Sequence, residues 1–155
     1  MTEIISTIQI HGPLPAVFDL VTTTRFWPQW HPATIGVGGV TERPFQQGDQ
    51  IQERAKIGEH VYEGTWTVTE HLRPAHAVLQ GSSGRIQIRY AFQQQQDAVA
   101  YSRTLVYHPE DFAAGVGDPS RLEKFMDQQS QQALQKLKAL VEQILADEAK
   151  VEIRG

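Results

Sequence analysis

The sequence contains no cysteine, which excludes disulfides and thiolate zinc sites and leaves the redox compartment undetermined. It also lacks any apolar run close to the ~18 residues that a membrane span needs. The first residues, MTEIIST, carry an acidic side chain and no basic region of the kind that opens a signal peptide. We therefore expect a cytoplasmic protein with no membrane span.

Clustered positive charge is missing as well. The chain has 14 Lys and Arg against 18 Asp and Glu, a net charge of −4, and its basic residues are scattered. Binding to nucleic acid requires clustered basic side chains that neutralise phosphates, so we expect no nucleic-acid partner. Hydrophobic residues at 40% and charged residues at 21% are ordinary for a globular protein. The length of 155 residues predicts one domain, 1–155, large enough for a core and a ligand cavity.

The N-terminal part predicts a strand followed by short helices. Residues 4–10 alternate weakly between apolar and polar side chains. Residues 14–21 place apolar side chains at i, i+3, i+4 and i+7, which is one face of a short helix. The threonines at 22–24 offer hydroxyls that predict an N-cap for a second helical turn containing Phe26 and Trp27.

Residues 35–107 follow a period of two, which predicts antiparallel strands with one apolar face. Gly58-Glu59 suits a two-residue hairpin turn. The resulting register pairs Ile57 with His60, Ala55 with Tyr62, Glu53 with Gly64 and Ile51 with Trp66. The GSSG stretch at 81–84 predicts a second turn, across which Leu79 and Ala77 face Ile86 and Ile88.

The C-terminal part predicts one long helix. Asp118 before Pro119, or Ser120 with Glu123 three residues later, supplies a start signal. The apolar stripe would run roughly 40 Å, enough to cross a sheet. Its members are Leu122, Phe125, Met126, Ala133, Leu137, Leu140, Val141, Ile144 and Leu145. The fold class is therefore α+β: a curved seven-stranded antiparallel sheet around a long C-terminal helix, with two short helices after the first strand.

The order of these elements resembles the START-like helix-grip superfamily, also called SRPBCC. The likeness is carried by VFDLVTTTRFWPQWHP before the meander of strands and by RLEKFMDQQSQQALQKLKALVE at the end, and it covers roughly residues 4–145. The sequence is most similar to the bacterial polyketide cyclase/dehydrase and lipid-transport group. The resemblance implies the helix-grip fold and a cavity for an apolar ligand between sheet and helix. The WPQW motif at 27–30 reports the fold and not the reaction.

The stretch FWPQWHPAT, residues 26–34, concentrates aromatic residues, which form only 8% of the chain. We interpret it as the corner that joins the short helices to the second strand. Trp27 and Trp30 are expected to pack under the open end of the sheet. His31 is expected either to pack there too or to line the mouth of the cavity.

No motif for a metal, a nucleotide or a covalent intermediate is recognisable. The six histidines have no tight ligand spacing, and His71 and His76 flank a turn at Arg73-Pro74. The GSSG stretch is a turn and not a G-x-S-x-G nucleophile elbow. We therefore expect no cofactor and no metal site.

Polar residues at apolar positions are the candidates for a binding site. Glu53 and Arg103 each lie between inward-facing apolar residues of a strand. A buried charge needs a partner, water or a ligand, so the two either form a structural ion pair, or a bulge turns one outward, or both face a wet cavity. Gln129 and Ser130 interrupt the helical stripe, which either leaves space beneath the helix or marks a drift toward solvent. The predicted cavity lining is Glu53, His60, Tyr62, Trp66, Tyr90, Tyr101, Arg103, Tyr107, Met126 and Gln129.

Three functions fit these observations. The one we favour is the binding of an apolar or aromatic small molecule, lipid- or polyketide-like, by a monomer or homodimer. The second is cofactor-independent cyclase/dehydrase chemistry, with Glu53 or His60 as the base and Arg103 or a tyrosine polarising a carbonyl. The third is a protein-interaction module, which a large exposed apolar patch would favour.

Overall fold

The computed structural model describes the backbone of residues 1–154 and the side chains of residues 1–152. Its elements in chain order are β1 (Thr2–His11), α1 (Leu14–Val21), η1 (Thr24–Phe26), α2 (Trp27–Trp30), β2 (Thr34–Gly39), β3 (Gln50–Ile57), β4 (His60–Leu72), β5 (His76–Gly81), β6 (Gln87–Gln95), β7 (Ala98–Tyr107), η2 (Pro109–Asp111), η3 (Ala113–Gly115) and α3 (Pro119–Arg154). The predicted fold class and order of elements are confirmed.

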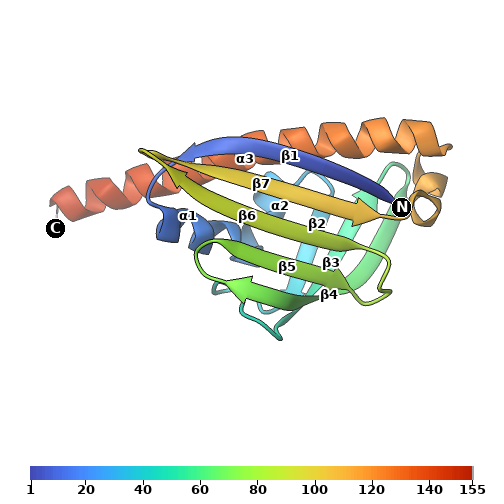
Figure 1. Ribbon diagram of the computed structural model, residues 1–155, viewed down its shortest axis with the longest axis horizontal. Helices are drawn as coiled ribbons and strands as arrows, with labels where there is room; N and C mark the ends of the chain where they lie inside the picture. The colour runs from blue at the N-terminus through green and yellow to red at the C-terminus, as the bar shows by residue number, and fades with distance from the viewer. Residues whose placement is uncertain (155) are drawn as a thin grey trace.

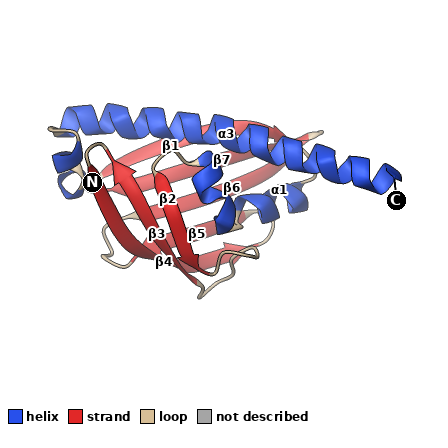
Figure 2. Ribbon diagram, turned by 180° about the vertical axis from the view of Figure 1, so that it is seen from behind, coloured by secondary structure: helices blue, strands red, loops and turns tan. Residues whose placement is uncertain are grey.

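The seven antiparallel strands form one sheet in the order β1-β7-β6-β5-β4-β3-β2. The sheet curls, and the three α-helices lie on its concave side (Figures 1 and 2). Along β7 every second side chain from Val99 to Tyr107 is buried, which is the pattern of a strand with one face on the core. The apolar core fills the space between this face and the helices.

The hairpin between β3 and β4 has the predicted register. Ile57 pairs with His60, and Ile51 pairs with Trp66. Because side chains alternate along a strand, this register puts Glu53 on the same face as Trp66. Gly58, with φ +61°, occupies the turn.

The hairpin between β5 and β6 differs from the prediction. Leu79 pairs with Ile88 and Ala77 with Tyr90, each two residues further along β6 than expected. The reason is that the connection is longer than a tight GSSG turn, since β5 continues to Gly81, whose N–H donates to the carbonyl of Ile86 (2.9 Å). A shift of two residues leaves the inward-facing set unchanged.

The threonines after α1 do not cap the next helix, so the predicted N-cap is wrong. The hydroxyls of Thr22 and Thr23 donate instead to the carbonyls of Phe18 and Asp19, at 2.8 and 2.7 Å. These carbonyls belong to the last turn of α1, where carbonyls run out of helical N–H partners; that of Phe18 also accepts the backbone N–H of Thr22 at 3.0 Å. The second helical turn forms without a side-chain cap, and Pro28 lies in its first turn, where a missing N–H costs nothing.

Helix α3 begins at the first of the two predicted start signals. Asp118 Oδ1 accepts the backbone N–H of Arg121 at 2.9 Å, as an N-cap does. The helix has 36 residues and is longer than its apolar stripe predicted. Its C-terminal end extends past the edge of the sheet (Figure 1).

Side-chain bonds fasten α3 to the edge strand β1. Lys138 Nζ donates to the carbonyl of Gln9 at 2.7 Å, and the backbone N–H of His11 donates to Glu142 Oε2 at 2.9 Å. Lys138 and Glu142 also pair with each other at 2.6 Å. These bonds fix the height of the helix above the sheet and so the space left beneath it.

The segment between β7 and α3 packs against the β3–β4 turn. The backbone N–H of Glu59 donates to the carbonyl of Gly115 at 2.9 Å. Gly58 approaches the same carbonyl so closely that a Cβ there would overlap it. Phe112 packs edge-on against Tyr62, with ring centroids 5.1 Å apart. The segment thus covers one end of the curled sheet.

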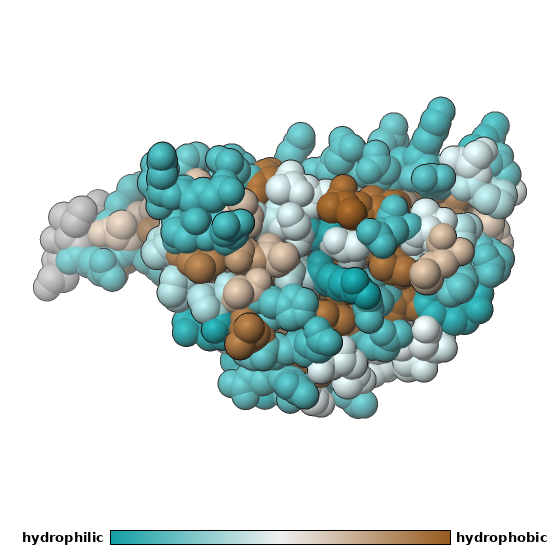
Figure 3. All heavy atoms as spheres, in the orientation of Figure 1, coloured by the Kyte–Doolittle hydropathy of each residue, from teal (hydrophilic) through white to brown (hydrophobic). Residues whose placement is uncertain are grey.

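The outer face of the sheet is largely hydrophilic, with hydrophobic residues in small separate patches (Figure 3). The exposed large hydrophobic side chains among the described residues are Met1, Ile5, Ile35, Val61, Leu72 and Val151. Scattered apolar side chains are normal on a protein surface, so the face in Figure 3 offers no broad apolar patch of the kind that marks an interaction module. Within the described residues, no helix is both long and apolar enough to cross a membrane.

Candidate functional site

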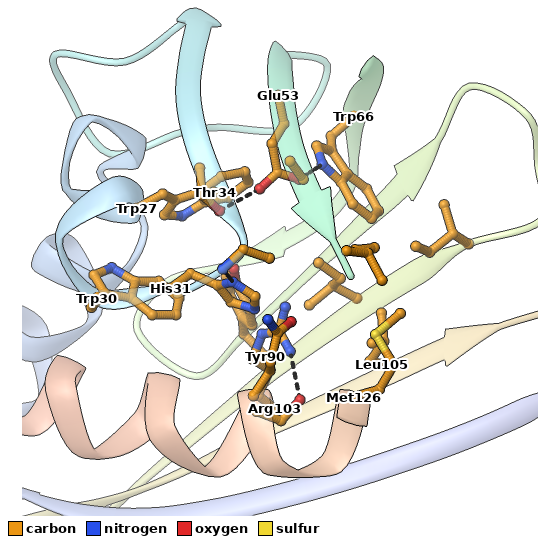
Figure 4. A pocket seen from close by; sticks show the side chains of 17 residues that line it. Trp27, Trp30, His31, Thr34, Glu53, Trp66, Tyr90, Arg103, Leu105 and Met126 are labelled. Atoms are coloured by element: carbon orange, nitrogen blue, oxygen red, sulfur yellow. Dashed lines mark hydrogen bonds between the residues drawn. The ribbon is translucent and has the colours of Figure 1, made fainter. Parts of the chain in front are cut away.

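A cavity of about 70 Å³ lies between the concave face of the sheet and α3 (Figure 4). It is about half the size of a ~150 Å³ cavity that admits a benzene ring, so in this shape it holds only a small group. Most of its wall is apolar. The lining residues are Trp27, Trp30, His31, Ala33, Thr34, Glu53, Ala55, Ile57, Trp66, Ile86, Ile88, Tyr90, Arg103, Leu105, Met126, Gln129 and Ser130.

A second hollow, of about 200 Å³, adjoins this cavity. It lies among the β3–β4 hairpin, the β5–β6 loop and Phe112. The two spaces share five wall residues, namely Glu53, Ala55, Ile57, Trp66 and Ile86. The two spaces therefore lie next to each other, with these side chains at their boundary.

Glu53 is held in place by two hydrogen bonds on the wall formed by β3. Thr34 Oγ1 donates to its Oε2 at 2.6 Å, and Trp66 Nε1 donates to its Oε1 at 3.0 Å. Each carboxylate oxygen has two lone pairs, so each can accept one more bond. The carboxylate is therefore fixed in position while it keeps acceptor capacity toward the cavity.

Arg103 lies on the facing wall, on β7, where it pairs across the sheet with Tyr90. It is 5% exposed, its Nη1 donates to Ser130 Oγ on α3 at 3.4 Å, and its guanidinium lies close enough to the Tyr90 hydroxyl to interact with it. None of the ion pairs among these residues joins Arg103 to Glu53. The structural ion pair that the sequence left open is not formed, and neither residue is turned outward.

Two further groups beside Arg103 are neutral. Burial, and next the positive charge of Arg103, hold the pKa of His31 well below its ordinary value. Its Nδ1 accepts the backbone N–H of Ala33 at 3.1 Å, so the ring proton is on Nε2. Burial raises the pKa of Tyr90 to about 12; the charge of Arg103 and a hydrogen bond from its guanidinium oppose this rise, and the charge of Glu53 adds to it. Tyr90 therefore keeps its phenolic proton at neutral pH.

The structure brings together most of the residues predicted to line the cavity. Those in its wall are Glu53, Trp66, Tyr90, Arg103, Met126 and Gln129, while Tyr62 lines the adjoining hollow. Ser130 is buried and faces inward, so the break in the helical stripe is not a drift toward solvent.

The other three predicted residues lie outside both walls. His60 is exposed, because it directly follows the β3–β4 turn. Tyr101 is buried in packing, stacked on Phe92 with ring centroids 4.9 Å apart. Tyr107, at the end of β7, packs against Phe112 at 6.2 Å. An inward-facing position thus does not by itself put a side chain at the cavity.

Several lining residues had a recognisable signal in the sequence and others had none. Leu105 and Ile88 lie on the inward-facing set of their strands, as predicted, but nothing marked them as facing a void. Trp27 and Trp30, predicted to pack, are 3% and 1% exposed and also form part of the wall. Thr34 had no signal, because its role depends on a bond to Glu53 across two strands.

The described residues do not bring together the side chains that a metal site needs. Among the described residues, no group of three or more His, Cys, Asp or Glu side chains could hold a metal ion. His76 is paired with Glu70, at 2.8 Å, and His71 packs against Phe18. The chemistry available at the cavity is therefore that of one carboxylate, one guanidinium and several neutral donors.

The chain belongs to the family described as polyketide cyclase / dehydrase and lipid transport, whose model matches residues 1–142. This match confirms the resemblance noted in the sequence. Among curated proteins, none matches this chain.

Solved structures similar to this one share its fold at low sequence identity. A protein from Thermus thermophilus is 12% identical, with a TM-score of 0.72 over 90% of this chain and 97% of that one. A Polyketide_cyc-like protein from Corynebacterium glutamicum is 16% identical, with a TM-score of 0.54 over 95% and 93%. BexL, a di-domain ARO/CYC of the BE-7585A biosynthetic pathway, is 14% identical, with a TM-score of 0.64 over 92% of this chain and 49% of its own. At these identities the likeness shows the fold alone.

Proposed function

We propose that the protein is a cytoplasmic binding protein, a monomer or homodimer, for an apolar or aromatic small molecule that is lipid- or polyketide-like. The observation that carries this proposal is a mostly apolar cavity between sheet and helix into which a few polar groups converge. Small-molecule sites are generally built in this way. Membership of a family described by lipid transport and polyketide cyclisation supports this class of ligand.

The size of the cavity defines how such a ligand sits. Drug-sized ligands occupy pockets of roughly 300–1,000 Å³, well above the 70 Å³ of the cavity. The ligand therefore places one end in the cavity and extends its body past Trp66 into the hollow of about 200 Å³. Trp66 lies in both walls and contacts the ligand where it passes from one space to the other.

Binding can be followed with the protein's own tryptophans. The sequence has three, and Trp27, Trp30 and Trp66 all line the cavity. Titration with octanamide and with 3-phenylpropanamide, two neutral apolar probes, should change the tryptophan emission and give a saturable heat in calorimetry. If neither these amides nor the corresponding carboxylic acids bound, the proposal would be wrong.

A matched pair of variants tests where the probes bind. Ala55 lines both the cavity and the hollow, so Ala55→Leu should fill the passage and weaken both probes. Ala91 is exposed on β6, so Ala91→Leu should leave binding unchanged. Binding that is equally strong in the two variants would place the probes elsewhere on the protein.

A second candidate, cofactor-independent cyclase or dehydrase activity, is favoured by the position of Glu53. Its carboxylate is held by Thr34 and Trp66 in the same cavity as a guanidinium, which pairs a base with a group that stabilises a developing oxyanion. Incubation with a synthetic poly-β-ketone thioester should then give a product lacking one water by mass spectrometry, and Glu53→Gln should abolish it. No product with the wild-type protein would leave binding as the function.

A further inference from the structure

The guanidinium of Arg103 is buried in the cavity wall with most of its hydrogen-bond donors unsatisfied by the residues that the structure describes. A guanidinium has five N–H donors, and among the described residues the polar neighbours of this one are two neutral hydroxyls: that of Ser130, at 3.4 Å, and that of Tyr90. Its Nε has no hydrogen-bond partner in the described part of the chain, although the residue is only 5% exposed. A buried cation without an anion is unfavourable unless something else supplies the missing charge. The guanidinium therefore retains the capacity to bind an anion from outside the chain.

The groups around Arg103 are donors as well. His31 Nδ1 accepts a hydrogen bond from the backbone N–H of Ala33, so the ring of this neutral histidine carries its proton on Nε2 and can donate from there. Ser130 accepts its bond from Arg103, which leaves its own hydroxyl proton free to donate. Tyr90 is the cross-strand neighbour of Arg103 and retains its phenolic O–H at neutral pH. Figure 4 shows His31, Tyr90 and Arg103 converging on the same side of the cavity, opposite Glu53.

We propose that the ligand of this cavity is an apolar carboxylic acid, whose carboxylate is bound by Arg103 together with the donors His31, Tyr90 and Ser130. This inference rests on the proposed function and specifies the ligand's polar end. A guanidinium binds a carboxylate through two parallel N–H···O bonds, which are stronger than bonds between neutral groups. The apolar body then extends away from Arg103, past Trp66 and into the adjoining hollow.

The charges of the wall limit the ligand to a single negative charge. Arg103 is the only positively charged side chain in the lining, since His31 is neutral. Glu53 lies in the same wall, and its carboxylate would repel a second negative charge. A carboxylate therefore fits the site better than a phosphate dianion. Glu53 retains acceptor capacity, which suits a hydroxyl further along the ligand.

The experiment compares acids with their neutral amides. Octanoate against octanamide, and 3-phenylpropanoate against 3-phenylpropanamide, differ at the polar end and share the apolar body. Calorimetry at neutral pH should show each acid binding the wild-type protein at least about tenfold more tightly than its amide, because charged hydrogen bonds contribute more than neutral ones. Equal affinities would overturn the inference, whereas the proposed function would fail only if the amides did not bind either.

Variants of Arg103 test whether it is the source of this preference. Arg103→Met should bring the ratio of acid to amide affinity close to one, and Arg103→Lys, which keeps the charge but loses the two parallel bonds, should keep part of it. Arg89→Met is the control, because Arg89 is exposed and lies on the other face of β6. A preference that survived Arg103→Met would place the carboxylate elsewhere and overturn the inference. Arg103→Met is expected to fold, since an apolar side chain replaces a buried unpaired cation.

Discussion

Replacing Trp30 with alanine should destabilise the protein strongly, because the main role of Trp30 is to pack in the core, and its contribution to the cavity wall is secondary. It is 1% exposed, and its ring packs edge-on against His31 with centroids 6.0 Å apart. A buried aromatic side chain removes ~150–250 Å² from water, which at ~25 cal/mol per Å² amounts to ~4–6 kcal/mol as an upper estimate. Measured truncations of large aromatic residues cost ~3–5 kcal/mol. We expect a loss of about 4 kcal/mol, or about 8–16 °C in Tm for a domain of this size.

Trp30→Phe separates the volume of the side chain from its polar atom. The indole Nε1 is buried and has no hydrogen-bond partner among the described residues. Phenylalanine keeps most of the packing and removes this unpaired donor, whose burial is itself unfavourable by ~1–3 kcal/mol. The phenylalanine variant should therefore lose less than about 2 kcal/mol, well below the alanine variant.

The measurement is urea unfolding followed by far-UV circular dichroism, since tryptophan emission changes with the substitutions themselves. The slope of free energy against urea must stay the same for the midpoints to be compared. If Trp30→Ala unfolded within about 0.5 kcal/mol of the wild type, the range of an unimportant surface substitution, the packing argument would be refuted. A simultaneous loss of octanamide binding would then identify Trp30 as a ligand-recognition residue.

Two further predictions concern His31 and the β3–β4 turn. Because the pKa of His31 is lowered in the folded protein, the unfolded chain binds the proton more readily, and stability is lost as the pH falls below the ordinary histidine value of about 6.5. His31→Asn keeps an acceptor for the backbone N–H of Ala33 and should lose less stability than the wild type between neutral and mildly acidic pH. The control is His60→Asn, at an exposed position, which should match the wild type. Equal losses of stability for His31→Asn and the wild type, measured by urea unfolding at each pH, would refute this prediction. Gly58→Ala should lower Tm more than Gly84→Ala, because both glycines have positive φ but only at Gly58 does a methyl group overlap a carbonyl of the chain; equal losses would mean that the packed segment moves aside freely.

Local patterns in the sequence were enough to predict the strands, their inward faces and one register. The β3–β4 hairpin was predictable because Gly58 allows the positive φ of a two-residue turn, and a turn of defined length sets every pair that follows. The longer β5–β6 connection has no such constraint. Its register was therefore predicted only to the extent that Ile88 and Tyr90 face inward.

The charged residues of the candidate site were also predictable from local sequence, whereas their bonding partners were not. Glu53 and Arg103 stand out because a charge at an inward-facing position conflicts with the cost of burying it. That conflict can be read from neighbouring residues. The bonds that resolve it, from Thr34 and Trp66 to Glu53, join strands that come together only in the fold.

Which inward-facing residues meet open space was decided by the tertiary structure alone. Tyr101, Arg103, Leu105 and Tyr107 alternate identically along β7, yet only Arg103 and Leu105 line the cavity. The difference arises from the curl of the sheet and from the height of α3, which bonds to β1 far away in sequence hold above the strands. A strand's pattern specifies the direction of each side chain, whereas the depth of the void beneath it depends on elements that the pattern does not contain.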